Sequence, residues 1–377
     1  MTVWICFWAF AASIFYLLLG YPLLLGLRRR VPVLKRFEPK TVTVVLAVRN
    51  GEQWLDRKLR NLLGLDYPAE LLDVLVVSDG STDRTEEIAH GWRGARVRLI
   101  ALPPCGKAAA LSAGIAQATG EILFFTDVRQ ELERGSLRAL VACLGDPKVG
   151  VVSGELVIRE GNSREEASVG LYWKYEKWIR MRESAVDSIL GATGCIYAMR
   201  RSLAVPLPSG VLLDDVFLPL AAFFKGFRLI LEPEAKAYDS PTSLHTEFRR
   251  KVRTQAGVYQ LLAFYPQLLS PSNRMWSDFL SHKLGRLLLP WLLLGLFGAS
   301  LALPGAWRGI ALVQIACYLL ALADPLIPDG FPLKRATSPM RAFVVLVAAA
   351  ACAISILFVP PERLWRPTHV RKSPENV

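Results

Sequence analysis

Residues 74–85 read Val-Leu-Val-Val-Ser-Asp-Gly-Ser-Thr-Asp-Arg-Thr, and the rest of the chain can be arranged around them. The first four residues are apolar and mostly β-branched, which is typical of a strand buried on both faces of a parallel sheet. Gly80 ends this strand, and Asp83 is placed to cap a helix that begins at Arg84. Asp79 therefore lies at the carboxyl end of a central strand, where open α/β sheets bind ligands. A simple Asp-Gly turn is the alternative.

Two further apolar runs also end in polar residues. Residues 42–51 read Val-Thr-Val-Val-Leu-Ala-Val-Arg-Asn-Gly, so a second buried strand leads to Arg49 and Asn50. Residues 121–127 read Glu-Ile-Leu-Phe-Phe-Thr-Asp and end at Asp127. Helical segments separate these strands. The pattern predicts an α/β fold with a doubly wound sheet and a nucleotide site along one edge.

A glycine and a lysine, Gly106 and Lys107, open a helix after a short predicted strand at residues 98–101. The amides of a helix N-terminus and an ammonium group both suit a diphosphate. A surface lysine without a ligand is the alternative, and this pair of residues alone would favour it.

Apolar residues gather at the two ends of the 377-residue chain, which is 52% hydrophobic. Residues 3–27 are apolar and long enough to cross a bilayer. Arg28, Arg29 and Arg30 follow directly, and no charged side chain precedes the run, which reverses the order of a secretory signal peptide. We therefore predict an uncleaved anchor with its N-terminus outside and the following domain in the cytoplasm.

Three more spans are predicted at residues 287–303, 310–326 and 343–359. The loop that carries Lys334 and Arg335 would return to the cytoplasm, as its charge predicts. The basic tail would then lie outside, against the usual bias, unless one segment is re-entrant. The chain is thus predicted to be an integral protein of the plasma (inner) membrane.

The net charge of +12 has a simple source, because many basic residues lie beside the predicted spans and would face anionic membrane lipids. The sequence holds no basic aromatic sheet motif and no zinc knuckle, so we predict no nucleic-acid partner. The six cysteines form no Cys-x-x-Cys pair, which indicates reduced thiols and no metal cluster.

These motifs, in this order, resemble the family-2 glycosyltransferases, which have the GT-A fold, and in particular the hyaluronan, chitin, cellulose and poly-N-acetylglucosamine synthase group. The resemblance runs from about Thr41 to the C-terminal membrane helices. It implies an anchor at 1–27, a cytoplasmic GT-A domain at 28–258, interfacial helices at 259–286, transmembrane helices at 287–359 and a tail at 360–377.

The resemblance implies a site for a nucleotide sugar, with a UDP-linked donor favoured. Its donor-side residues would be Arg49, Asn50, Asp79, Lys107, Asp127, Arg129 and Arg253. The family's Asp-x-Asp stands here as Asp127-Val-Arg129, so Asp127 would hold Mg²⁺ or Mn²⁺ without a second acid. One carboxylate, phosphate oxygens and water are adequate for Mg²⁺. Arg129 could also neutralise phosphate directly, in a site that depends little on metal.

Two adjacent acids, Asp214 and Asp215, stand between apolar residues, which is awkward unless they begin a helix or do chemistry. They match the family's acidic pair, whose second member is the catalytic base. The resemblance therefore implies Asp215 as the base and Asp214 as its supporting neighbour.

The acceptor side is also implied by the resemblance. Its residues would be Gly191, Thr193, Gly194 and Arg250. Processive members carry Gln-x-x-Arg-Trp, where this chain has Arg250, Arg253 and Thr254. The missing tryptophan, which stacks on the acceptor sugar in the family, weakens the expectation of long-chain synthesis.

The resemblance implies a membrane-bound inverting glycosyltransferase that moves a sugar to a growing polysaccharide or glycan hydroxyl. A single addition to a lipid or polyprenyl-type acceptor is the nearest alternative, favoured by Thr254. An inactive nucleotide-sugar-binding subunit of a glycan export system is the third. The presence together of Asp79, Asp127 and Asp215 argues against it.

Overall fold

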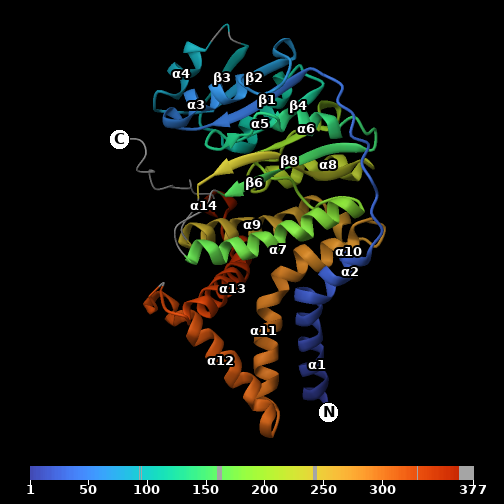
Figure 1. The fold of residues 1–377 in the computed structure, drawn as a ribbon, viewed down its shortest axis with the longest axis vertical. Helices are drawn as coiled ribbons and strands as arrows, with labels where there is room; N and C mark the ends of the chain where they lie inside the picture. The colour runs from blue at the N-terminus through green and yellow to red at the C-terminus, as the bar shows by residue number, and fades with distance from the viewer. Residues whose placement is uncertain (93, 95, 159–163, 241–243, 329, 365–377) are drawn as a thin grey trace. The chain divides into compact units, whose positions relative to one another are not determined.

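The computed structural model describes residues 1–377 except 93, 95, 159–163, 241–243, 329 and 365–377 (Figure 1). The chain divides into two units. The sheet unit comprises Arg29–Arg159 and Glu183–Ser240, and the helical unit comprises Met1–Arg28, Glu160–Arg182 and Pro241–Val377.

One eight-stranded sheet, in the order β3-β2-β1-β4-β7-β6-β8-β5, forms the centre of the sheet unit. Its strands are β1 (Val42–Val48), β2 (Leu72–Asp79), β3 (Val97–Leu102), β4 (Ile122–Phe125), β5 (Glu131–Leu132), β6 (Val149–Ile158), β7 (Tyr197–Arg200) and β8 (Arg228–Asp239). The neighbours β3, β2, β1 and β4 are parallel, as predicted. They bring the ends of β1, β2 and β4 to one edge.

The structure confirms the predicted α/β fold, and the other half of its sheet adds antiparallel strands. Strand β7 runs antiparallel to both β4 and β6, and β5 runs antiparallel to β8. The fold is α/β, but the sheet is mixed. The reason is local: Tyr197 pairs with Phe125, so β7 begins at the edge where β4 ends and must run back against it.

Helices cover both faces of the sheet. They are α3 (Glu52–Leu63), α4 (Thr85–Gly91), α5 (Lys107–Gln117), α6 (Ser136–Cys143) and α8 (Asp214–Phe224). On one face, Leu55 and Leu59 of α3 join the core cluster that contains Leu46 of β1. On the other, a Cβ at Gly114 of α5 would lie 2.7 Å from Val45 Cγ1, so glycine permits a close approach. Burial on both faces explains the continuous apolar run of β1.

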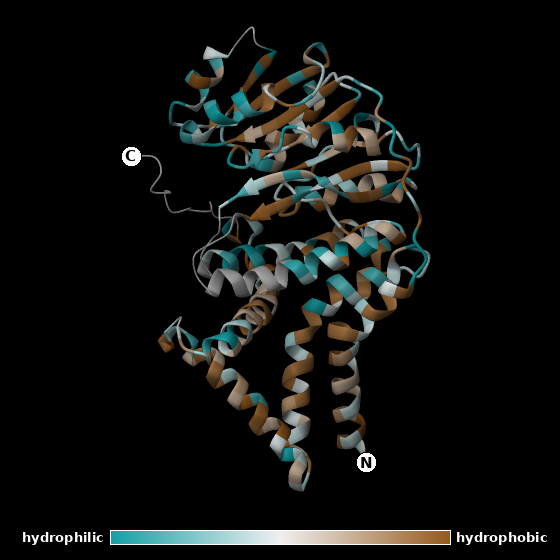
Figure 2. Ribbon diagram, viewed as in Figure 1, coloured by the Kyte–Doolittle hydropathy of each residue, from teal (hydrophilic) through white to brown (hydrophobic). Residues whose placement is uncertain are grey.

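The helical unit holds the long apolar helices, which are brown along most of their length in Figure 2. Its helices are α1 (Thr2–Phe15), α2 (Tyr21–Leu27), α9 (Leu244–Phe264), α10 (Trp276–Asp278), α11 (Gly285–Ala302), α12 (Arg308–Ala323), α13 (Lys334–Cys352), α14 (Pro361–Leu364) and most of α7 (Arg164–Val186). Within the described part of the chain, four continuous helical stretches are long and apolar enough to cross a membrane: Thr2–Leu27, Trp276–Ala302, Gly305–Leu326 and Lys334–Leu357. One N-terminal and three C-terminal apolar helices were predicted, and the structure confirms them.

The second of these stretches begins earlier than predicted. The helix is continuous from Trp276, through a π-helical turn at Phe279–Leu284, so the segment predicted as a separate interfacial helix is its first part. Polar residues in this first part of the helix have partners inside the helical unit. Buried Asp278 accepts hydrogen bonds from Arg28 Nη1 at 2.6 Å and from the Tyr21 hydroxyl at 3.0 Å. Helix α9 likewise runs through the boundary predicted at residues 258/259.

Helix α1 packs along α11. A Cβ at Gly295 of α11 would lie 2.6 Å from the Phe10 ring, so this glycine lets the two helices approach closely. Near the N-terminal end of α1, the rings of Trp4 and Trp8 pack edge to face on Trp307, with centroids 5.0 and 5.8 Å from that of Trp307. The aromatic cluster fixes the N-terminal end of α1 against the chain that follows α11.

Candidate functional site

The loops after β1 and β2 fasten each other at the carboxyl edge of the sheet. The Thr82 N–H donates to Asn50 Oδ1 at 2.8 Å, and the Glu52 N–H donates to Asp83 Oδ2 at 3.0 Å. Asn50 has a φ of 52°, a left-handed conformation that asparagine tolerates. Asp83 also accepts from the Thr85 N–H, so it fastens the start of α4, one residue later than predicted. Asn50, which was predicted on the nucleotide-sugar side of the site, thus shapes this edge of the sheet.

Asp79 organises the next loop. Its side chain is buried, and Oδ1 accepts hydrogen bonds from the Cys105 N–H at 2.7 Å and the Gly106 N–H at 2.9 Å. Gly80 follows with a φ of 60°, and a Cβ there would lie 2.4 Å from Pro104. Asp79 therefore places the Gly106-Lys107 turn at the end of β2.

Lys107 joins two of the predicted acids. Its Nζ lies 3.2 Å from Asp127 Oδ1 and 3.3 Å from Asp214 Oδ2. Burial alone would lower the pKa of this ammonium, but the carboxylates of Asp127, Asp214 and Asp215 raise it above its ordinary value. Lys107 is therefore charged, and the structure brings the predicted metal ligand and the acidic pair together around it.

The acidic pair begins helix α8, one of the two situations predicted for it. Asp214 is buried and Asp215 is half-buried. Negative side chains are favourable at a helix N-terminus, because the macrodipole is positive there. A Cβ at Gly194 would lie 2.8 Å from Asp215 Oδ2, so the predicted acceptor-side loop lies directly against the predicted base.

A proline inside α8 shapes this contact. Pro219 has no N–H, so the carbonyl of Asp215, four residues earlier, lacks its usual helical donor. The Ala192 N–H donates to that carbonyl instead, at 2.8 Å. Helix α8 therefore holds the loop through its own main chain.

The loop at residues 191–196 is fastened at further points. The Thr193 N–H donates to Ser153 Oγ at 2.9 Å, and the Thr126 hydroxyl donates to the Cys195 carbonyl at 2.8 Å. Gly191 has a φ of 149°, and a Cβ there would lie 2.7 Å from a methyl of Val216. Glycine is needed at this position.

Asp127 and Arg129 have different surroundings. The Asp127 side chain is 40% exposed and therefore accessible to a ligand. Arg129 instead pairs with buried Asp239, and its Nη2 lies 2.5 Å from Asp239 Oδ2. Among the residues that the structure describes, no three His, Cys, Asp or Glu side chains are grouped to hold a metal. A single accessible carboxylate still fits Mg²⁺ or Mn²⁺, since phosphate oxygens and water complete the coordination.

Sequence reasoning missed Lys58 and Thr126. Lys58 lies on α3 and is 2% exposed, and its Nζ donates to Thr126 Oγ1 at 2.8 Å and to the Gln130 carbonyl at 2.7 Å. Burial lowers the pKa of Lys58 to about 7. Its spacing from Leu55 and Leu62 places it on the buried face of α3, and this was the available signal.

Tyr197 was also missed. Its ring is fully buried and stacks on Phe125, with centroids 4.6 Å apart. Burial, and then the nearby acids Asp214, Asp215 and Asp127, raise the pKa of its hydroxyl. No hydrogen-bond partner for this hydroxyl is found in the described part of the chain.

The remaining predicted residues are not part of the group around Lys107. Arg49 is exposed at the end of β1. Arg250 and Arg253 belong to α9 in the helical unit, where Arg250 Nη1 lies 3.3 Å from Glu247 Oε1. Their places beside an acceptor and a diphosphate stay predictions.

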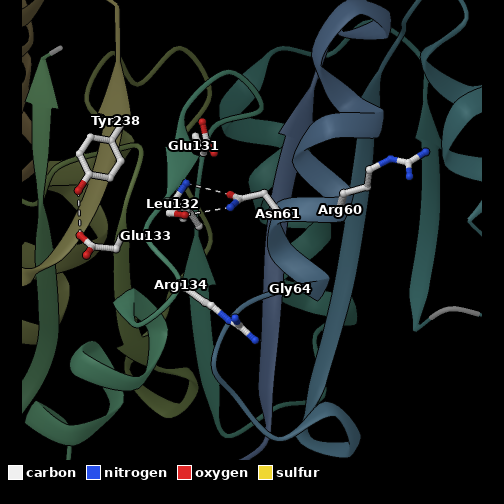
Figure 3. A pocket seen from close by; sticks show the side chains of 8 residues that line it. All are labelled: Arg60, Asn61, Gly64, Glu131, Leu132, Glu133, Arg134 and Tyr238. Carbon is white, nitrogen blue, oxygen red and sulfur yellow. Dashed lines mark hydrogen bonds between the residues drawn. The ribbon is translucent and has the colours of Figure 1, made fainter.

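A separate pocket of the sheet unit lies beside β5 (Figure 3). It is lined by Arg60, Asn61, Gly64, Glu131, Leu132, Glu133, Arg134 and Tyr238. The Asn61 amide exchanges two hydrogen bonds with the main chain of Leu132, at 2.8 and 2.9 Å. None of the predicted site residues lines this pocket.

Residues 43–205 match the family model described as Glycosyl transferase family 2. The probable glycosyltransferase YdaM of Bacillus subtilis is 25% identical over 243 residues, which is 60% of this chain and 57% of that protein. The poly-beta-1,6-N-acetyl-D-glucosamine synthase of Staphylococcus epidermidis is 22% identical over 237 residues, again 60% and 57%. The chain thus matches little more than half the length of these two relatives.

The structure is also similar to the mannosyltransferase PcManGT of Pyrobaculum calidifontis, solved with GDP-Man and Mn²⁺. The likeness covers 94% of this chain and 99% of that one, with a TM-score of 0.72 and 23% identity. At this identity the likeness concerns the fold.

Proposed function

We propose that the protein transfers a sugar from a nucleoside diphosphate sugar to an acceptor hydroxyl with inversion, because residues 43–205 match the glycosyltransferase family 2 model and the fold is similar to that of a solved mannosyltransferase. The observation that carries this proposal is the position of Lys107, whose Nζ lies within 3.3 Å of both Asp127 and Asp214. A fixed cation between these acids suits a reaction in which a diphosphate departs and a hydroxyl loses its proton.

Each residue would have a defined part. Asp79 would hold the nucleoside, and Lys107, with Arg253, would hold the diphosphate. Asp215 would take the proton from the acceptor hydroxyl as it attacks the anomeric carbon. The charged Lys107 would stabilise the negative charge that develops on the leaving diphosphate. A divalent cation, held by Asp127, would supply further neutralisation of that charge when bound.

The donor would carry UDP, as the resemblance implied, with GDP as the alternative to be tested. The mannosyltransferase of similar fold was solved with GDP-Man, so the fold itself is compatible with a purine nucleotide. For the acceptor we propose a growing glycan. The relative named as a poly-N-acetylglucosamine synthase supports this choice, and Thr254 in place of the family's tryptophan favours the lipid or polyprenyl alternative.

We further propose that the four apolar helices anchor the protein in the plasma (inner) membrane with the catalytic domain in the cytoplasm. The proposal rests on their length and composition and on the basic residues that follow the first of them. Membrane lipids would then be permanent partners of the protein.

The test is transfer by the detergent-purified full chain, offered UDP- and GDP-linked sugars with Mg²⁺ or Mn²⁺. Release of the nucleotide should require divalent cation and should fall on Asp127→Ala. Asp66→Ala provides the matched control, because Asp66 is an exposed aspartate in the loop before β2. Chelator-resistant turnover would show that Lys107 and Arg129 carry the diphosphate without metal. No release from any donor would favour the inactive export subunit.

A further inference from the structure

A lysine lies among the leucines of α3. Lys58 is 2% exposed, and Leu55 and Leu59 beside it are fully buried. A buried amine is costly unless hydrogen bonds satisfy it. Lys58 Nζ donates hydrogen bonds to Thr126 Oγ1 at 2.8 Å and to the Gln130 carbonyl at 2.7 Å. The buried Lys58 amine therefore depends on these two hydrogen-bond acceptors.

Both acceptors belong to the segment at residues 126–130, one at each end. Asp127, the proposed metal ligand, lies within this segment. The far end is also held by its side chain, because Gln130 Nε2 donates to Asp239 Oδ2 at 2.8 Å. Lys58 thus holds the segment on both sides of Asp127, through the Thr126 hydroxyl and the Gln130 carbonyl.

Thr126 extends the connection to another loop. Its hydroxyl accepts from Lys58, and its single hydrogen is donated to the Cys195 carbonyl at 2.8 Å. Hydrogen bonds in such a chain polarise and strengthen one another in a buried setting. Three elements, α3, the segment after β4 and the loop at 191–196, are therefore joined by one hydroxyl.

We infer that Lys58 and Thr126 are positioning residues that keep the donor side and the acceptor side of the site in register. The loop at 191–196 is bonded at one end to Thr126 and at the other, through Ala192, to the carbonyl of Asp215. The segment of the metal ligand and the helix of the proposed base are thereby connected through a single loop. This inference rests on the proposed function for the identity of the two sides.

The variants follow from the geometry. Lys58→Met keeps the apolar stem and removes the donors, and Thr126→Val keeps the shape and removes the hydroxyl. Thr126→Ser keeps the hydroxyl and should rescue. Asn61→Leu is the matched control, because Asn61 lies on the same helix and bonds the main chain of Leu132 but not the loop at 191–196.

The first measurement is hydrogen exchange on the purified full chain without substrate. Lys58→Met and Thr126→Val should each raise exchange roughly threefold to tenfold in peptides covering both 126–130 and 191–196. Asn61→Leu should raise it near residue 132 only, and Thr126→Ser should resemble the wild type. An increase confined to 126–130, or a general increase that Asn61→Leu reproduces, would overturn the inference.

The second measurement is kinetic. The double variant of Lys58→Met and Thr126→Val should lose less kcat/KM than the two single losses combined, because each single variant already removes the hydrogen bond between Lys58 and Thr126. The KM for the acceptor should rise in both single variants, although neither residue contacts the acceptor in the proposed site. Thr126→Ser should have the KM of the wild type. Additive losses would refute the inference. A wild-type chain that transfers no sugar would contradict the proposed function, while the exchange result still decides the coupling of the two loops.

Discussion

At the scale of the residue, Lys107 connects groups that would serve different steps. Its ammonium now faces two carboxylates, at 3.2 Å and 3.3 Å. A nucleoside diphosphate would offer the same cation phosphate oxygens instead. Binding of the donor would then exchange one set of anionic partners for another, and Asp127 would become available to a metal.

The sharpest residue-scale prediction concerns Asp215. Asp215→Asn keeps the shape and removes the basicity, so transfer should fall by about 10²–10⁴-fold. Nucleotide affinity should stay within a few-fold, because the nucleotide would rest on Asp79 and the cations. Transfer rates and nucleotide titrations, with folding checked by thermal melting, measure both effects.

Asp214→Asn is the matched control for that prediction. Asp214 lies 3.3 Å from Lys107, and in the proposed function it only supports the base, so its loss should slow transfer less. A dead Asp214→Asn together with a near-normal Asp215→Asn would mean that the base is misassigned by one residue.

Lys58 predicts a pH dependence of stability. Burial lowers its pKa to about 7 in the folded chain, from an ordinary value of 10.5. Between these values the unfolded chain binds the proton and the folded chain does not, so rising pH favours folding. Relative to Lys58→Met, the wild-type free energy of unfolding should grow above pH 7 by up to about 1.4 kcal/mol per pH unit.

Thermal melting of both proteins at pH 6.5, 7.5, 8.5 and 9.5 measures this difference. Below pH 7 both states of the wild type hold the proton, so the difference should be constant there. A difference that does not change between pH 7 and pH 9.5 would show that Lys58 keeps an ordinary pKa.

The candidate residues that the sequence singled out are those that belong to a recognisable motif. Asp79, Lys107, Asp127 and the pair at 214 and 215 stand at strand ends or helix starts, and the structure places them there. Lys58 and Thr126 have no such local signature. Their importance comes from contacts between residues about 70 positions apart, which periodicity does not encode.

At the scale of the element, helix α8 depends on an irregularity. Pro219→Ala would supply a main-chain N–H at position 219. This N–H would compete with the Ala192 N–H for the carbonyl of Asp215. The helix itself should become more stable, because proline in a helix interior costs about 3 kcal/mol. We therefore expect an unchanged or higher melting temperature together with an acceptor KM raised several-fold.

Pro290→Ala is the control, since Pro290 lies inside α11 of the helical unit. It should leave the acceptor KM unchanged. If Pro219→Ala left that KM unchanged as well, the main-chain contact of the loop with α8 would have no part in acceptor binding.

The types of the elements were largely predictable from the sequence, but the direction of some strands and the start of some helices were not. Buried apolar runs predicted the parallel strands, whereas the antiparallel direction of β7 depends on its pairing with β4. The start of the helix at Trp276 was not predicted, because this part of it carries the polar residues Asp278 and His282. Their partners, Arg28 and Glu176, lie far away in the sequence, so the sequence alone does not show that these polar side chains are satisfied.

At the scale of the whole molecule, orientation is testable. Reporter fusions placed after Lys40 and within the 330s should both report the cytoplasm, because basic residues flank these positions. An external signal after Lys40 would contradict the orientation and the donor proposal together, since nucleotide sugars are made in the cytosol.

The first apolar helix carries one further consequence. Its 26 residues, from Thr2 to Leu27, correspond to about 39 Å of helix, against about 30 Å of hydrocarbon in an ordinary bilayer. The indole cluster around Trp307 anchors one end, and Arg28 anchors the other through Asp278. In the proposed membrane-spanning arrangement, a hydrophobic mismatch of this size would be relieved by tilting of the helix or by a thicker membrane, so the activity of the protein would depend on the acyl-chain length of the lipids around it.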